Sequence, residues 1–160
     1  MDKIFIMNLG TTSFKFKLYR MDERVQEVLA EGELENVGAM SSAWFLGYPD
    51  GRSRKGSDPI ADHGVAFAHF AGLLQEDGVL SQLSDLDAVG YKAVHGGSLS
   101  GTCPVDDALM EEMERMVPLA PAHNPIYLTA MKTIRERFPG LRQIARFETS
   151  FHGTIPDCRT

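Results

Sequence analysis

The sequence has little cysteine: its 160 residues include only Cys103 and Cys158. Neither belongs to a Cys-x-x-Cys pair, so the sequence indicates neither a disulfide scaffold nor a zinc finger. The start of the chain also lacks the features of a secretory signal peptide, because it has no long apolar stretch and no small-residue cleavage site. We therefore expect a cytoplasmic protein whose two thiols are unpaired.

Long apolar runs and an excess of basic residues are missing too. No segment approaches the ~18 apolar residues that span a membrane. Lys and Arg number 16 against 22 Asp and Glu, which gives a net charge of −6 and argues against a nucleic-acid partner. With 43% hydrophobic and 24% charged residues, the composition is that of a globular protein with a core of its own.

The first forty residues have the patterns of strands. Residues 4–7 form a short apolar run, which predicts a strand buried on both faces. Residues 14–19 alternate apolar and polar side chains, as a half-buried strand does, and residues 25–34 make a plausible third strand. Residues 36–61 are rich in Gly, Ser and Pro, and we expect a loop or an irregular edge strand there.

Helical patterns follow from Asp62, a candidate N-cap. Residues 87–94 predict a strand, and Asp106 opens a helix that runs to residue 117. Asn124 and Pro125 have the pattern of a cap followed by a first-turn proline, before a helix that ends near residue 138 and a last strand over 142–147. The predicted order β-β-β-α-β-α-α-β indicates an α/β fold, a mixed sheet with helices on its faces.

Two segments near predicted strand ends offer groups that bind anions. In residues 8–15, a glycine and three hydroxyls offer N–H and O–H donors to a phosphate, although the spacing alone favours an ordinary hairpin turn and no Walker A motif occurs. In residues 92–97, a cation, a histidine and two glycines end a strand and would let the backbone approach a ligand. A plain strand end with a satisfied histidine explains the second segment equally well.

Two further segments lie later in the chain. His123 precedes a helix N-terminus, where anions are favoured, although an ordinary Asn-Pro helix start explains everything there except this histidine. Glu148 follows a strand and could position Mg²⁺ or orient a nucleophile, or it could be a solvated loop residue. His63 and His69 are interpreted as surface or packing residues.

Taken in order, these segments resemble the amino-terminal half of acetate kinase, in a group that includes propionate and butyrate kinases and belongs to the actin superfamily. The resemblance covers essentially all of the chain. The motifs that carry it are Asn8-x-Gly10-Thr11-Thr12-Ser13-x-Lys15, Val94-His95-Gly96-Gly97, Leu119-Ala120-Pro121-x-His123-Asn124-Pro125 and Phe147-x-Thr149-x-Phe151-His152-x-Thr154-x-Pro156.

The resemblance implies a ribonuclease-H-like fold and a carboxylate kinase, which makes an acyl phosphate and ADP from ATP and a short-chain carboxylic acid with Mg²⁺. Members are more than twice as long as this chain and are usually homodimers. Residues 1–160 would be a single amino-terminal acyl-binding domain, and the nucleotide-binding domain would be absent from the chain. This half alone is expected to have no kinase activity.

The resemblance also implies roles for single residues. Asn8 would lie near the Mg²⁺ and the phosphates, and Val94 would form a wall of the acyl pocket. His123 would belong to the catalytic site, while Lys15 is given a structural role first. The phosphate-side turn would consist of Gly10, Thr11, Thr12 and Ser13.

Three positions depart from the family pattern. Lys92 stands where the family has an arginine that binds the carboxylate and the transferred phosphoryl group, so one point charge replaces a bidentate fork. Glu148 stands where the family has aspartate, and Ala122 where leucine is common, which predicts a larger acid. Because the first two changes conserve charge, we favour a working, divergent site with Lys92, Glu148 and His123 as its catalytic residues. The alternative is a non-catalytic ribonuclease-H-like module for binding or assembly.

Overall fold

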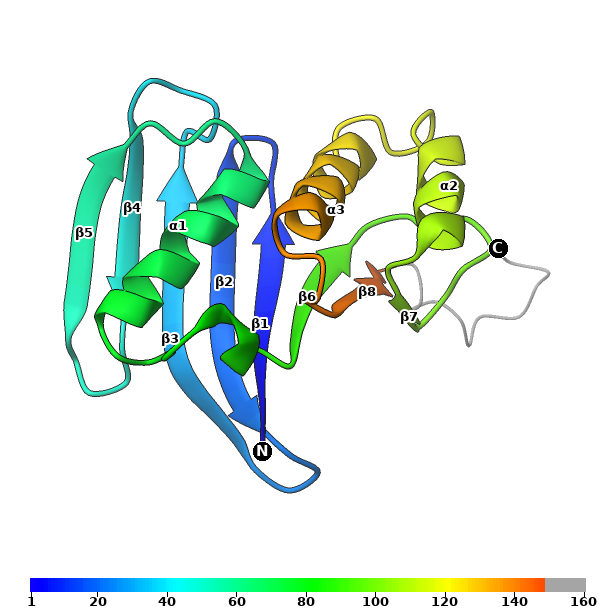
Figure 1. The fold of residues 1–160 in the computed structure, drawn as a ribbon. Helices are drawn as coiled ribbons and strands as arrows, with labels where there is room; N and C mark the ends of the chain where they lie inside the picture. Colours follow the sequence, from blue (N-terminus) through cyan, green and yellow to red (C-terminus); the bar gives the residue numbers. More distant parts are fainter. Residues whose placement is uncertain (149–160) are drawn as a thin grey trace.

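The computed structural model describes residues 1–148. Its strands form one mixed eight-stranded sheet (Figure 1). The strand order across this sheet is β5-β4-β3-β2-β1-β6-β8-β7. The strands are β1 (Asp2–Leu9), β2 (Ser13–Met21), β3 (Gln26–Glu35), β4 (Ser42–Gly47), β5 (Ser53–Asp58), β6 (Ala88–Ala93), β7 (Thr102–Pro104) and β8 (Gln143–Phe147). The helices are α1 (His63–Glu76), the short 3₁₀ helix η1 (Leu83–Asp85), α2 (Asp107–Arg115) and α3 (Asn124–Arg137).

The first five strands form an antiparallel meander, which extends the predicted three-strand meander by two strands. The expectation of a loop or irregular edge over residues 36–61 is wrong for β4 and β5. Strand β5 has the sequence SRKGSD and therefore lacks the apolar alternation that marks a strand. Its backbone pairs with β4 at the edge of the sheet, which needs no buried side chains.

The parallel half of the sheet determines where the carboxyl ends of the strands lie. Strand β6 pairs in parallel with β1 on one side and with β8 on the other. The predicted helix-connected strands are thus confirmed, and the unpredicted β7 adds a three-residue antiparallel edge to β8. None of the helices described in residues 1–148 is both long and apolar enough to cross a membrane.

The helices α1 and α3 lie on the same face of the sheet (Figure 1). On that side Phe5, Met7 and Leu9 of β1 are at most 3% exposed, whereas Ile6 between them is 36% exposed. The prediction that this strand is buried on both faces is therefore wrong: its apolar run faces a covered side and an open side in alternation. The open face is the side on which Ile6 and Asn8 lie.

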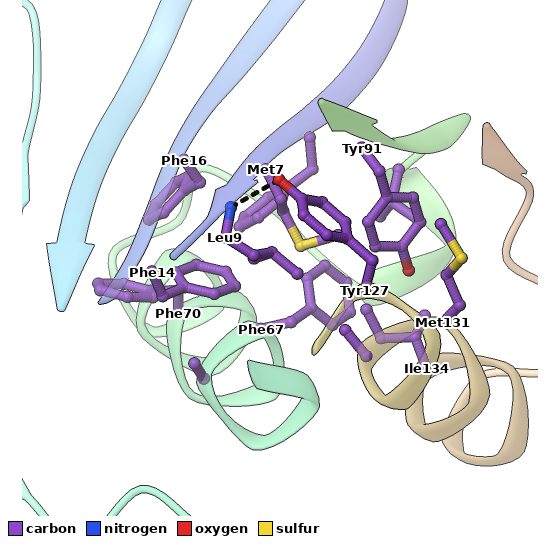
Figure 2. Packing of buried hydrophobic residues seen from close by; sticks show 14 of the residues in the cluster. Met7, Leu9, Phe14, Phe16, Phe67, Phe70, Tyr91, Tyr127, Met131 and Ile134 are labelled. Carbon is purple, nitrogen blue, oxygen red and sulfur yellow. Dashed lines mark hydrogen bonds between the residues drawn. The ribbon is translucent and has the colours of Figure 1, made fainter. Parts of the chain in front are cut away.

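Aromatic rings fill the covered side (Figure 2). Phe5 stacks on Phe16 with ring centroids 4.3 Å apart and meets Phe67 of α1 edge-on at 5.0 Å. Burying one such side chain stabilises the fold by roughly 1.5–3 kcal/mol. This aromatic cluster fixes the position of α1 over the meander.

Local signals explain the starts of α1 and α2. The Oδ1 atoms of Asp62 and Asp106 each accept a backbone N–H of the first turn at 2.8 Å, which confirms both predicted caps. The predicted cap at Asn124 is wrong, because His123 occupies the N-cap position and Asn124 is the first helical residue. The buried Asn124 amide instead donates to two carbonyl oxygens, of His95 and Met113, at 3.0 Å each. It therefore joins the start of α3 to the loop after β6.

Candidate functional site

A cavity of roughly 280 Å³ lies where the carboxyl ends of β1 and β6 meet the start of α3. Ligands of α/β sheets collect at this edge, because the loops that follow parallel strands converge there. The turn between β1 and β2 and the residue after β8 close the cavity. The lining residues are Asn8, Leu9, Gly10, Ser13, Lys15, Lys92, Val94, His123, Tyr127 and Glu148.

The structure brings most of the predicted site residues to this one cavity. Thr11, Thr12 and Ala122 are the exceptions: all three are exposed, and none is among the lining residues. The prediction that Ala122 forms part of the acyl pocket therefore gains no support from the geometry. The later residues of the fourth motif, 149–156, lie outside the described residues. Predicted residues that do line the cavity are Asn8, Gly10, Ser13, Lys92, Val94, His123 and Glu148.

Lys92 and Glu148 form an ion pair, with 2.7 Å between Nζ and Oε1. They come from the ends of the parallel neighbours β6 and β8, as their positions in the sequence predicted. Their side chains are 57% and 47% exposed. An ion pair this accessible to water contributes little to folding stability. Both charged groups are thus available to a ligand.

The turn between β1 and β2 has a tight backbone. The Gly10 N–H donates to the Ser13 carbonyl at 2.9 Å, and a Cβ at Gly10 would lie 2.4 Å from Ser13 Oγ. A side chain at this position would displace the Ser13 hydroxyl, so glycine lets that hydroxyl keep its place beside the cavity. The exposed Thr11 and Thr12 form the tip of this turn, away from the cavity lining.

His63, the first residue of α1, holds this turn by hydrogen bonds to its backbone. Its Nε2 lies 2.9 Å from the Gly10 carbonyl oxygen and 3.1 Å from that of Ser13. Both partners are acceptors, so Nε2 carries a hydrogen. Burial lowers the pKa of His63 below its usual range, which keeps the ring neutral at pH 7. The interpretation of His63 as a packing residue missed this role, because no local pattern reveals a contact across fifty residues of chain.

Tyr127 and Lys15 are two further polar residues that line the cavity. The buried Tyr127 hydroxyl accepts the Leu9 N–H at 3.1 Å (Figure 2). Burial, together with the nearby Glu148 charge, raises the pKa of Tyr127 to about 12, against a smaller lowering by the Leu9 hydrogen bond. Lys15 pairs with Glu33 at 3.3 Å on the neighbouring strand, which fits the structural role expected for it. Nothing in the helical pattern of the sequence marks Tyr127 as a site residue.

A larger hollow, of roughly 450 Å³, lies on the open face of the sheet and shares Asn8, Lys15 and Lys92 with the cavity. Most of the charged residues that line this hollow are already paired across strands: Lys15 with Glu33, and Lys17 with Glu31 at 3.0 Å. The smaller cavity is the better candidate site because it combines the strand ends, the turn and the helix start.

The donor set of the cavity limits the metal it can hold. Oxygen ligands are available from Asn8, Ser13 and Glu148. Among residues 1–148, no group of three or more His, Cys, Asp or Glu side chains is placed to hold a metal ion. This set suits a Mg²⁺ that keeps several waters and takes oxygens from a bound phosphate, and not a tightly caged ion.

Known proteins resemble this chain over nearly its whole length. Residues 3–159 match the Acetokinase family. The chain is 35% identical over 158 residues to the acetate kinase of Oceanobacillus iheyensis, covering 98% of this chain and 39% of that protein.

Solved structures show the same fold. The crystal structure of Porphyromonas gingivalis acetate kinase matches with a TM-score of 0.90 and 31% identity, over 99% of this chain and 40% of that one. A propionate kinase from Francisella tularensis subsp. tularensis matches with a TM-score of 0.84 and 26% identity, over 99% and 40%. The predicted ribonuclease-H-like fold is confirmed, and the chain spans about two fifths of the length of these relatives.

Proposed function

The chain belongs to the acetokinase family, and from this we propose that its cavity binds the carboxylate and phosphoryl groups of an acetate-kinase-type reaction. The reaction transfers a phosphoryl group from ATP to a short-chain carboxylic acid and yields an acyl phosphate and ADP. This chain would supply the acceptor side, and the residues that bind the nucleotide would come from outside it. A cytoplasmic homodimer is part of the same proposal and rests on family membership alone.

The observation that carries the proposal is the accessible ion pair of Lys92 and Glu148 at the ends of two parallel strands. In phosphoryl transfer, catalysis consists largely of positioning and of stabilising charge. The Lys92 ammonium would contact the anionic oxygens of the acid and of the transferred group. Glu148 would hold Lys92 in place and orient the acceptor. It need not remove a proton, because a carboxylic acid is already ionised at neutral pH.

The turn at Gly10–Ser13 would bind the phosphoryl side of the ligand. The His63 ring contacts the carbonyl oxygens of Gly10 and Ser13, so the backbone of the turn is held in one shape before a ligand binds. Mg²⁺ would be held by Asn8 and Glu148 together with phosphate oxygens, and it would supply charge neutralisation. His123, at the N-cap of α3, would add a donor from the opposite wall.

The family's pair of opposite charges would be conserved by Lys92 and Glu148. The donor geometry and the lengths of the two side chains would differ from those of the family. Lysine offers a point charge in place of a planar fork, and glutamate is one methylene longer than aspartate. The two side chains meet at 2.7 Å between Nζ and Oε1, so the charge pair would be kept. This supports a working, divergent site over a decayed one.

Binding of acetyl phosphate to the 160-residue chain tests the proposal. We expect titration to shift the backbone amide NMR signals of residues 8–13 and 92–94, and Lys92→Ala to weaken binding about 10- to 100-fold, as loss of a charged hydrogen bond does. The matched control is Lys55→Ala, which removes an exposed lysine from β5 at the far edge of the sheet. Shifts elsewhere, or an equal loss in both variants, would contradict the proposal. The chain alone should form no acetyl phosphate from ATP and acetate.

A further inference from the structure

Tyr127 is a buried tyrosine whose hydroxyl reaches the wall of the cavity. It lies in the first turn of α3, is 1% exposed and is one of the lining residues. Its hydroxyl oxygen points to the end of β1 and accepts the N–H of Leu9 (Figure 2). The ring of Tyr91 meets it edge-on at 6.3 Å, so packing and a backbone hydrogen bond together hold the phenol in place.

The hydrogen of this hydroxyl is left without an acceptor in the part of the chain that the structure describes. The Leu9 N–H approaches the oxygen as a donor, so the phenolic hydrogen must point elsewhere. Buried donors are normally satisfied, by protein, by water or by a ligand. Tyr91 illustrates the usual case: its hydroxyl donates to Gln143 Oε1 at 2.5 Å. Of these two core tyrosines, Tyr127 is the one that lines the cavity.

We propose that Tyr127 donates its hydroxyl hydrogen to an oxygen of the anion that binds in the cavity, a carboxylate or a phosphoryl group. This rests on the proposed function and adds a ligand-binding residue to it. Lys92 lines the same cavity, so the anion would receive a neutral donor from α3 and a cation from β6. Hydrogen bonds from O–H to a charged oxygen are short and strong.

The protonation state of Tyr127 suits this role. Its raised pKa, about 12, keeps the hydrogen on the oxygen throughout the neutral range. Because Leu9 is followed directly by Gly10, a ligand oxygen held by Tyr127 lies next to the start of the phosphate-side turn. Tyr127 would therefore set where the anion sits between α3 and that turn.

The test measures binding of acetate and of inorganic phosphate, separately, to the 160-residue chain and two variants. Tyr127→Phe keeps the ring and removes the hydroxyl, and Tyr91→Phe is the matched control in the same core. We expect Tyr127→Phe to weaken binding of at least one anion about 10-fold while Tyr91→Phe leaves both unchanged. The anion that is affected shows whether the donor serves the carboxylate or the phosphoryl group. Equal affinities in wild type and Tyr127→Phe would overturn the inference and leave the proposed function standing, whereas wild-type chain that binds neither anion would overturn both.

A second variant separates donation to the ligand from support of the Leu9 amide. Difluorotyrosine, placed at position 127 by genetic code expansion, keeps the hydroxyl but makes it a stronger donor and a weaker acceptor. If Tyr127 donates to the anion, binding tightens in this variant. Binding that stays unchanged or weakens would show that the hydroxyl serves only the Leu9 backbone, and would overturn the inference.

Discussion

The two faces of the sheet in residues 1–148 have opposite chemistry, although they are built from the same strands. On the covered face, Phe5, Phe14 and Phe16 pack against α1 and are at most 3% exposed. On the open face, Lys15 and Lys17 alternate with the phenylalanines of β2 and form cross-strand ion pairs with Glu33 and Glu31. The covered face determines stability, and the open face contributes little to it, because exposed ion pairs are worth at most about 1 kcal/mol.

The candidate site lies where these two faces meet, at the carboxyl edge of β1 and β6. It takes rigidity from the covered side, through Tyr127 and His63, and charge from the accessible side, through Lys92 and Glu148. The comparison separates the buried aromatic residues that stabilise the fold from the accessible charged pair that we propose binds the ligand. Substitutions can therefore test each set alone.

The largest effect is expected in the core. Phe67→Ala should lower the free energy of unfolding by about 3–5 kcal/mol, because Phe67 is fully buried between Phe5 and Phe138. Phe45→Ala on β4 should cost less than about 1 kcal/mol, because Phe45 is 40% exposed. Urea unfolding measures both. Similar losses in the two variants would show that the faces do not differ as described.

The charge pair should show the reverse behaviour. Lys92→Ala and Glu148→Ala should each weaken acetyl phosphate binding about 10- to 100-fold and change unfolding by less than about 1 kcal/mol. The double variant should bind little worse than either single one, because residues that act as a unit are not additive. A double-variant loss equal to the sum of the single losses would show that the two side chains act independently.

Acid should lower the free energy of unfolding through the buried histidines His63 and His69. Burial lowers the pKa of His63 and also that of His69, so the unfolded chain takes up protons first as pH falls. Stability is therefore fully present above about pH 6.5 and declines below it, by at most about 1.4 kcal/mol per pH unit for each histidine. His63→Gln should flatten part of this decline in urea unfolding at pH 5 to 8. An unchanged slope in both His63→Gln and His69→Gln would refute this origin.

The smallest effect is expected at Ala122. Family resemblance predicts that this alanine enlarges the acyl pocket, but the residue is exposed and outside the cavity lining. Ala122→Leu should therefore leave the relative affinities for acetate, propionate and butyrate unchanged. A shift toward acetate in a competition titration would place Ala122 in the pocket after all.

Local chemistry explains which parts of the fold could be predicted from the sequence. Asp62 and Asp106 are followed by helical patterns, and their caps are confirmed because capping depends on neighbouring residues. Strand β5 escaped prediction because an edge strand can form from backbone pairing without apolar side chains. The cap assigned to Asn124 was wrong because its amide is used by two carbonyl groups from other segments.

The same distinction holds for the site. Ordered motifs predicted Asn8, Lys92, His123 and Glu148, since each lies at the end of a predicted strand or the start of a helix. Tyr127 carries no such mark, because its place at the cavity depends on folding and on a hydrogen bond to Leu9 across more than a hundred residues of chain. Cavity-lining residues that belong to a motif at a strand end or a helix start were thus more predictable than one placed by a long-range hydrogen bond.

We propose that this chain supplies the acceptor side of a carboxylate kinase. The most direct measurement joins the chain to the remainder of Porphyromonas gingivalis acetate kinase, in place of the 40% of that protein that it matches. The account predicts that the chimera forms acyl phosphate from ATP and a short-chain acid with Mg²⁺, that Lys92→Ala removes most of this activity, and that Lys55→Ala does not. A chimera that folds and binds ATP but forms no acyl phosphate with acetate, propionate or butyrate would contradict it.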